Sequence, residues 1–147
     1  MKRSEILENR KKAVEFLKQP ERKKCGGRLV STYDQESRCC LGHMCESLIP
    51  ETKELKTSDS DENILYAYYQ GEMYAAPPLL VEKLGLHGIV GGSYLSKNYL
   101  IAEFPCNSLA QLNDNSPLTT QEIGAYLESV IEGGDDTPWK NLSEYEE

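Results

Sequence analysis

The sequence has no long apolar run, and this lack limits what the chain can do. No stretch approaches the roughly 18 consecutive apolar residues of a membrane-spanning helix, so we expect no membrane association. The first residues are polar and charged, with no apolar core and no small-residue cleavage site, which is not the pattern of a secretory signal. We therefore expect a cytoplasmic protein.

Signatures of common catalytic sites are missing as well. The chain contains no phosphate-binding P-loop, no GxGxxG dinucleotide motif, no GxSxG nucleophile elbow and no HExxH zinc motif. Paired carboxylates carry little information in a chain with 24 acidic residues. We therefore expect a binding protein rather than an enzyme, with no catalytic residues, no cofactor and no metal site.

Charge is plentiful but unevenly distributed. The 147 residues, 39% hydrophobic and 27% charged, are typical of one globular domain, and the net charge of −8 argues against stable nucleic-acid binding. Residues 1–38 nevertheless hold eleven Lys and Arg and six acidic residues, whereas residues 39–147 hold five and eighteen. The basic segment is interpreted either as a solvated helix face with a flexible arm or as one wall of an anion site.

The cysteines leave three interpretations open. They are Cys25, Cys39, Cys40, Cys45 and Cys106, and an odd number without a secretory signal indicates reduced thiols. Three of them crowd around His43, which could complete a zinc site with a more distant cysteine or form a thiolate–imidazole pair. The plainer alternative is that the cysteines are small core residues and the histidine lies at the surface.

Periodicity predicts four helices. The first covers residues 5–18 and is capped by Ser4, and the second lies around CCLGHMCESLI. The third is short, begins at Pro77 and Pro78, and ends at Gly85. The fourth runs from Thr119 toward Gly133 and Gly134. The last has the strongest local signal, because Thr119 and Glu122 have the spacing of a capping box. Gly42 interrupts an apolar helical face, which suggests close packing or the approach of a ligand.

The remaining segments predict strands, turns and a tail. GRLVSTY, NILYAYYQ and YLIAEF have strand composition, MYAA is expected to pair back on NILYAYYQ as a hairpin, and the polar residues 50–62 are expected to form a loop. Residues 134–147 are acidic and are predicted to be a flexible tail. The expected fold is a single α+β domain over residues 1–133, with short helices packed on an antiparallel sheet.

Four segments together resemble a known protein family. RCCLGHMCESL, APPLLVEKLGL, SLAQLNDNS and LTTQEIGAYLE, between Arg38 and Glu128, are similar to small phage and prophage proteins of undefined function. This chain departs from their pattern at His43, where a small apolar residue is usual, and at Gly124, where alanine is usual. The resemblance implies a phage origin and a role against host defence, and it brings no catalytic residues.

Tyrosine supplies nine of the twelve aromatic residues, and several lie on the predicted hairpin. Tyrosine rings can stack on a base while arginine and lysine hold phosphate, although alternating tyrosines are also ordinary strand composition. The Asn-Asp corner before the last helix is interpreted as a turn or helix cap that borders the same site. The predicted ligand-binding residues are Lys24, Arg28, Tyr33, Arg38, His43, Tyr66, Tyr69, Asn113 and Asp114.

These observations favour one function and leave two alternatives. The first is a phage anti-defence protein that binds and sequesters a nucleotide-derived host immune signal, without cleaving it, in the cytoplasm of the infected cell. The second is a protein inhibitor that docks on a host nuclease or defence effector through its acidic surface. The third is a small thiol- or metal-dependent hydrolase. Because ligand pockets often form between subunits, we also expect a homo-oligomer.

Overall fold

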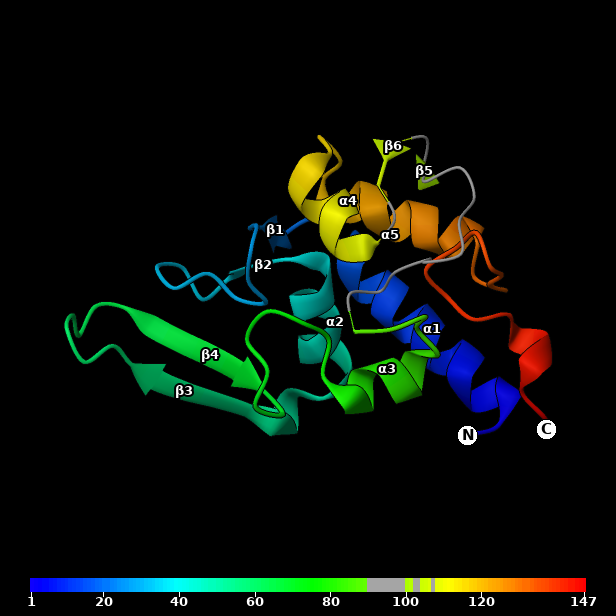
Figure 1. The fold of residues 1–147 in the computed structure, drawn as a ribbon, viewed down its shortest axis with the longest axis horizontal. Coiled ribbons are helices and arrows are strands. Elements are labelled where there is room, and N and C mark those ends of the chain that lie inside the picture. Colours follow the sequence, from blue (N-terminus) through cyan, green and yellow to red (C-terminus); the bar gives the residue numbers. More distant parts are fainter. Residues whose placement is uncertain (90–99, 102–103, 107) are drawn as a thin grey trace.

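The protein is a small α+β domain, and its computed structural model describes residues 1–89, 100–101, 104–106 and 108–147. The helices are α1 (Arg3–Lys18), α2 (Cys40–Leu48), α3 (Pro78–Leu84), α4 (Leu109–Asn115) and α5 (Thr120–Ser129), with 3₁₀ turns η1 (Pro50–Thr52) and η2 (Leu142–Glu144). The strands are β1 (Lys23–Lys24), β2 (Ser37–Arg38), β3 (Lys53–Thr57), β4 (Leu65–Tyr69), β5 (Leu100–Ile101) and β6 (Phe104–Pro105). Figure 1 shows a helical body from which the β3–β4 hairpin projects.

The helical body is organised around α1, which packs against α2, α3 and α5. Its apolar stripe, which includes Ile6, Ala13 and Leu17, is fully buried, as an amphipathic helix requires. Gly42 in α2 allows an even closer contact, because a Cβ there would lie 1.8 Å from the backbone oxygen of Leu29. The glycine therefore serves close packing of residue 29 against α2.

One buried arginine in α1 forms hydrogen bonds with several segments of this helical body. Arg10 is fully buried, and its guanidinium donates hydrogen bonds to the backbone oxygens of Leu84 (2.8 Å), Ile131 (2.8 Å), Gly85 (3.3 Å) and Lys140 (2.7 Å). Burial lowers the pKa of Arg10 to about 10, so the side chain remains protonated at neutral pH. One charged group from α1 thus satisfies carbonyls from three separate segments of the chain.

Most predicted helices are confirmed, with shifts at their ends. The capping box of α5 is present, since Thr119 Oγ1 accepts from the Glu122 N–H (3.1 Å) and the Glu122 carboxylate accepts from the Thr119 N–H (3.0 Å). Gly85 adopts φ 65° at the end of α3. The prediction of Ser4 as a helix cap is wrong: α1 starts at Arg3, and the Ser4 hydroxyl donates to the Glu147 carboxylate (2.9 Å).

The largest correction concerns the strands. β4 pairs with β3 in an antiparallel register that runs from Lys53↔Tyr69 to Thr57↔Leu65, so part of the predicted loop 50–62 is a strand. MYAA forms no partner strand, and Glu72 makes only a bridge with Tyr69. GRLVSTY contributes only a bridge at Val30. Of YLIAEF, β5 and the start of β6 are formed, and residues 99, 102 and 103 lie outside the described residues.

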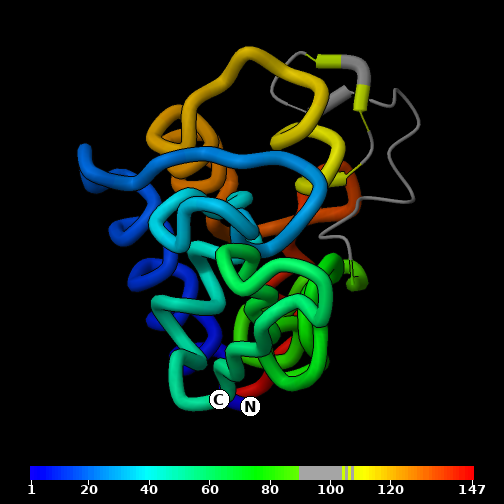
Figure 2. The backbone as a smooth tube through the Cα atoms, turned by 90° about the vertical axis from the view of Figure 1, so that its left-hand side faces the viewer, coloured from blue at the N-terminus to red at the C-terminus, as the bar shows by residue number. Residues whose placement is uncertain are grey.

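The acidic C-terminal segment, expected to be a flexible tail, packs on the domain. Trp139 is fully buried and donates its indole N–H to the Leu127 oxygen (3.1 Å), and Leu142 is buried as well. The backbone N–H of Arg3 donates to the Glu146 oxygen (3.0 Å), which brings the two termini together, as Figure 2 shows. The burial of Trp139 and Leu142 holds this segment against the domain although the segment is acidic, so residues 134–147 belong to the folded unit.

Candidate functional site

The strongest candidate site is an arginine held between two tyrosines beside β4. Arg28 lies in the loop between β1 and β2, and its guanidinium carbon lies 5.6 Å from the ring centroid of Tyr66 and 5.5 Å from that of Tyr74. Its Nη1 also contacts the Met73 sulfur (3.6 Å). No carboxylate of the described residues lies within 4 Å of this guanidinium. The cation is therefore positioned by aromatic rings and makes no ion-pair contact with a carboxylate of the described residues.

A small cavity adjoins this arginine. It has a volume of about 60 Å³ and is lined by Gly27, Arg28, Cys39, Leu41, Tyr74, Ala110 and Asp114. A cavity of this size accepts a small group and not a whole nucleotide. Tyr74 is 59% exposed beside it. A larger ligand would therefore place one group in the cavity and the rest across the exposed ring.

A second group of predicted residues meets on the opposite face of the hairpin. Tyr69 alternates with Tyr66 along β4, so it points away from Arg28 and toward α2. Its hydroxyl donates to the Glu46 carboxylate (2.5 Å), and that carboxylate also lies 4.0 Å from Arg38 Nη2 and 4.0 Å from Lys53 Nζ. Burial, and then the hydrogen bond to Glu46, raise the pKa of Tyr69.

Two of the predicted ligand-binding residues, Arg38 and Tyr69, therefore interact with Glu46 inside the protein. Sequence reasoning missed this glutamate because it stands as the one acid on an otherwise apolar helix and has no motif around it. The Nε of Arg38 is buried without a hydrogen-bond partner among the described residues. Even so, the guanidinium faces a carboxylate, so Arg38 joins β2 to α2 and Tyr69 joins the hairpin to α2, and neither forms a wall of the Arg28 site.

The cysteine–histidine cluster is part of the core. Burial raises the pKa of Cys39 to about 12 and that of Cys25 to about 11, so both thiols are protonated near neutral pH. His43 is fully buried, not at the surface as one interpretation held, and it donates its Nε2–H to the Lys23 oxygen (2.7 Å). Burial lowers the pKa of His43 to about 4. Neither partner of a thiolate–imidazole pair is in its reactive form.

A metal site finds no support in the same region. Within residues 1–89 and the described part of 100–147, no three His, Cys, Asp or Glu side chains come together as a metal ion requires. The Cys39 sulfur instead accepts from the Gly42 N–H (3.4 Å), which caps the start of α2. Cys39, Cys40, Cys45 and Cys106 are thus small core residues, and Cys25 is half-buried.

The other predicted site residues have structural partners or stand alone. Lys24 Nζ donates to the backbone oxygens of Ser116 (3.0 Å) and Leu118 (2.7 Å). Asn113 is buried, accepts from the Cys40 N–H (3.0 Å), and so caps α2. Asp114 accepts from the Gly27 N–H (3.2 Å) at the rim of the small cavity. Tyr33 is 82% exposed, and among the described residues its ring forms no cation–π or ring–ring pair.

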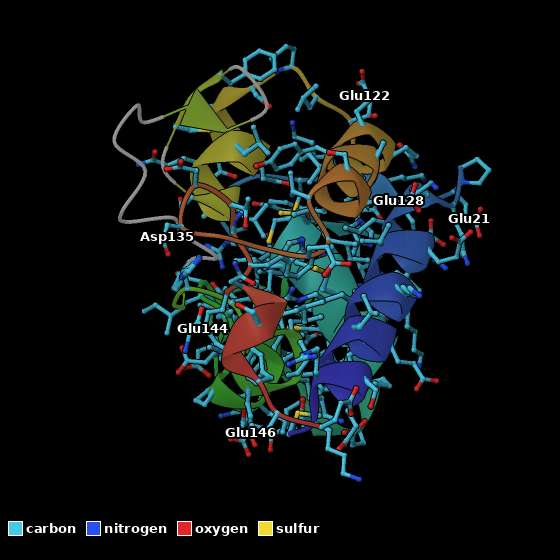
Figure 3. The ribbon with its side chains drawn as sticks, turned by 90° about the vertical axis from the view of Figure 1, so that its right-hand side faces the viewer. Glu21, Glu122, Glu128, Asp135, Glu144 and Glu146 are labelled. Carbon is cyan, nitrogen blue, oxygen red and sulfur yellow. The ribbon has the colours of Figure 1, made fainter. Side chains whose placement is uncertain are left out.

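Exposed acids are distributed over the face opposite the hairpin. Figure 3 labels Glu21, Glu122, Glu128, Asp135, Glu144 and Glu146, which come from the turn after α1, from α5 and from the C-terminal segment. Lys18 Nζ lies 3.1 Å from the Glu128 carboxylate, so part of this charge is neutralised locally. The face is therefore acidic, with part of its charge paired.

Comparison with known proteins adds no identity. No protein-family model, no curated protein and no solved structure matches the chain. Among the described helices, none combines the length and the apolar composition needed to cross a bilayer. The geometry of the sites must therefore carry the functional argument.

Proposed function

We propose that this protein is a non-catalytic binding protein that holds a nucleotide-derived anion at Arg28 between Tyr66 and Tyr74. The observation that carries the proposal is a guanidinium fixed by two rings, at 5.6 and 5.5 Å, with no carboxylate partner among the described residues. A guanidinium offers a fork of N–H donors that suits phosphate, and the neighbouring rings offer stacking surfaces for a base.

The shape of the site favours a ligand with several different groups. In the proposed complex the phosphate lies on the exposed side of Arg28 and a base stacks on Tyr74. Asp114 lines the 60 Å³ cavity, and a carboxylate there suits a ribose hydroxyl, which can donate a hydrogen bond, better than a second phosphate. A ligand of this composition is a phosphorylated nucleoside or a cyclic nucleotide signal.

The proposed role in the cell is sequestration. The resemblance to small phage proteins suggests a host immune signal as the ligand, held in the cytoplasm of the infected cell. Buried, protonated thiols and a neutral, buried imidazole give no support to the hydrolase alternative. Binding without cleavage therefore fits the chemistry of the described residues best.

The experiment is a thermal-shift and calorimetric titration with cyclic dinucleotides and ADP-ribose. A ligand at 100 times its Kd stabilises a protein by about 2.7 kcal/mol, which is a readily measured shift. Arg28→Gln is expected to weaken binding at least tenfold. Arg22→Gln is the matched control, because Arg22 also stacks on a ring, that of Phe16 at 3.6 Å, but away from the site. The control should bind as the unmodified protein does.

Two further measurements decide the outcome. Ligand released by heating should be recovered intact, and cleaved product would overturn sequestration. Absence of binding to every nucleotide in the panel, or equal affinity of Arg28→Gln and Arg22→Gln, would overturn the site.

The acidic face supports a second candidate, a protein inhibitor that covers a basic groove of a host protein. Deleting residues 135–147 would not test it, because the deletion removes the buried Trp139. Instead, Asp135→Asn combined with Glu144→Gln and Glu146→Gln changes only exposed carboxylates. Weaker inhibition of a host nuclease by this triple variant would support docking, and unchanged inhibition would count against it.

A further inference from the structure

The two edges of the β3–β4 hairpin differ in what covers them. Along β4, the Leu65 N–H donates to the Thr32 oxygen (3.3 Å), and Tyr69 and Glu72 exchange backbone hydrogen bonds (2.9 Å each). Along β3, no described residue accepts from the N–H of Leu55 or Thr57. Figure 1 shows β3 on the side of the hairpin that faces away from the β1–β2 loop. The hairpin therefore has one covered edge and one open edge.

The register decides which β3 residues point to the open edge. Ser58 donates to the Ile64 oxygen (3.0 Å) and Gln70 donates to the Thr52 oxygen (3.2 Å), so these two pairs are hydrogen-bonded pairs of the hairpin. Bonded pairs alternate along an antiparallel ladder, so Glu54 and Lys56 also bond to β4. The backbone groups of the odd-numbered residues 53, 55 and 57 consequently point outward. Of these, only the Lys53 N–H is occupied, by the Pro50 oxygen.

We propose that β3 is a homodimer interface, in which the open edge pairs antiparallel with β3 of a second copy about a two-fold axis at Leu55. In this register residue 55 faces residue 55 of the other copy, and residue 53 faces residue 57. These are the residues whose backbone groups point outward. Each copy then donates from its Leu55 and Thr57 N–H to the Leu55 and Lys53 oxygens opposite, and the two hairpins form one four-stranded sheet.

The side chains of the KELKT strand complement themselves in this register. Glu54 of one copy lies directly opposite Lys56 of the other, and the reciprocal pair follows from the two-fold axis. These are non-hydrogen-bonded pairs, in which facing side chains are closest. The side chain of Leu55, 53% exposed in the monomer, meets its own counterpart on the other face of the sheet.

The same charges exclude the neighbouring registers. A shift of two residues in one direction places Lys56 opposite Lys56, and a shift in the other direction places Glu54 opposite Glu54. Like charges directly opposite each other destabilise a strand pair. Charged residues usually protect an open strand edge from pairing with another chain. In β3 the charges instead leave one antiparallel pairing with a second copy favourable, the one centred at Leu55.

The experiment uses complementary charge reversals and sedimentation equilibrium over a concentration series. Glu54→Lys alone and Lys56→Glu alone each place like charges opposite each other, so each variant should raise the dimer dissociation constant at least tenfold. An equimolar mixture of the two variants restores both opposite-charge pairs and should recover dimerisation as a heterodimer. Glu8→Lys and Lys11→Glu, at exposed positions of α1, repeat the charge changes away from the interface and should leave it unchanged.

A backbone variant tests the hydrogen bonds separately. Leu55→Pro removes only an N–H that points outward, a position at which an edge strand tolerates proline, so the monomer should fold and fail to dimerise. In the unmodified protein, amide exchange at Leu55 and Thr57 should slow as concentration rises. The proposal is overturned by a protein that stays monomeric at millimolar concentration, by dimers that the β3 variants leave unaffected, or by a mixture that forms no heterodimer.

Discussion

The helical body and the β3–β4 hairpin differ in how much of their surface is buried and in the contacts that hold them in place. In the body, α1 buries its apolar stripe and satisfies its one buried charge with four carbonyl hydrogen bonds. In the hairpin, four of the five β3 residues are exposed, and its contact with α2 runs through the polar Tyr69–Glu46 pair. Stability therefore resides mainly in the body, while the hairpin presents the Arg28 site on one face and an open edge along its side.

The largest effect should come from breaking the closest contact in the body. Gly42→Ala would favour an ordinary helix by about 1 kcal/mol, but here the new Cβ would lie 1.8 Å from the Leu29 oxygen. We expect a loss of about 3 kcal/mol in the free energy of unfolding, measured by denaturant titration. Glu8→Ala, at an exposed position of α1, should change it by less than about 0.5 kcal/mol. A small loss in Gly42→Ala would mean that residue 29 moves away from α2 easily.

Acid should destabilise the body through His43. Its pKa is about 4 in the folded protein and 6.5 in the unfolded chain, so the unfolded state binds more protons between these values and stability falls as pH decreases through this window. The contribution is about 2 kcal/mol between pH 7 and pH 5. His43→Gln keeps a donor for the Lys23 oxygen without a titrating group, so its unfolding free energy should fall less over the same range. Equal pH profiles of the two proteins would refute this origin.

The joint between the two regions should have an intermediate effect. Tyr69→Phe removes the hydroxyl that donates to Glu46 and should lower the unfolding free energy by about 1 kcal/mol. Tyr68→Phe is the matched control, because Tyr68 lies on the opposite face of β4, where Lys56 Nζ is 5.2 Å from its ring. A larger effect at Tyr68 than at Tyr69 would show that the hairpin is fastened by its other face.

The smallest effect on stability is expected at the proposed ligand site itself. Arg28→Gln removes two cation–π contacts at a half-buried position, which contribute about 1 kcal/mol or less. The same substitution should abolish most ligand binding, so thermal unfolding without ligand and titration with ligand should respond very differently. A loss as large as that of Gly42→Ala would assign Arg28 a structural role.

The sequence predicts the body better than the hairpin because local signals determine the body. The apolar spacing around Met44 and the capping box at Thr119 specify helices whatever their neighbours are. β3 has no such signal, since KELKT is exposed along most of its length and gains its structure only from β4. The burial of Trp139 has no local sequence signal either, because the segment around it is acidic. Its ring packs against a distant part of the chain: the guanidinium carbon of Arg10 in α1, 129 residues away, lies 5.0 Å from the ring centroid.

The candidate site was predicted in part. Residue type and hairpin position indicated Arg28 and Tyr66, and the structure brings them together. The alternation of side chains along β4 predicts that Tyr69 and Tyr66 lie on opposite faces of the hairpin. No local pattern predicts that the Tyr69 hydroxyl donates to Glu46 of α2. Pairings over long sequence separations, such as Lys24 with Leu118, are set by the tertiary fold alone.

The placement of Arg10 also affects the order in which the chain can fold during synthesis. Its guanidinium is synthesised with α1, while two of its carbonyl partners, at Ile131 and Lys140, are synthesised 121 and 130 residues later. Until these residues emerge, closing the helices would bury a cation without its full set of acceptors. The helices can therefore close around Arg10 with all its acceptors in place only after Lys140 has emerged, and a chain that stalls before this residue would stay open.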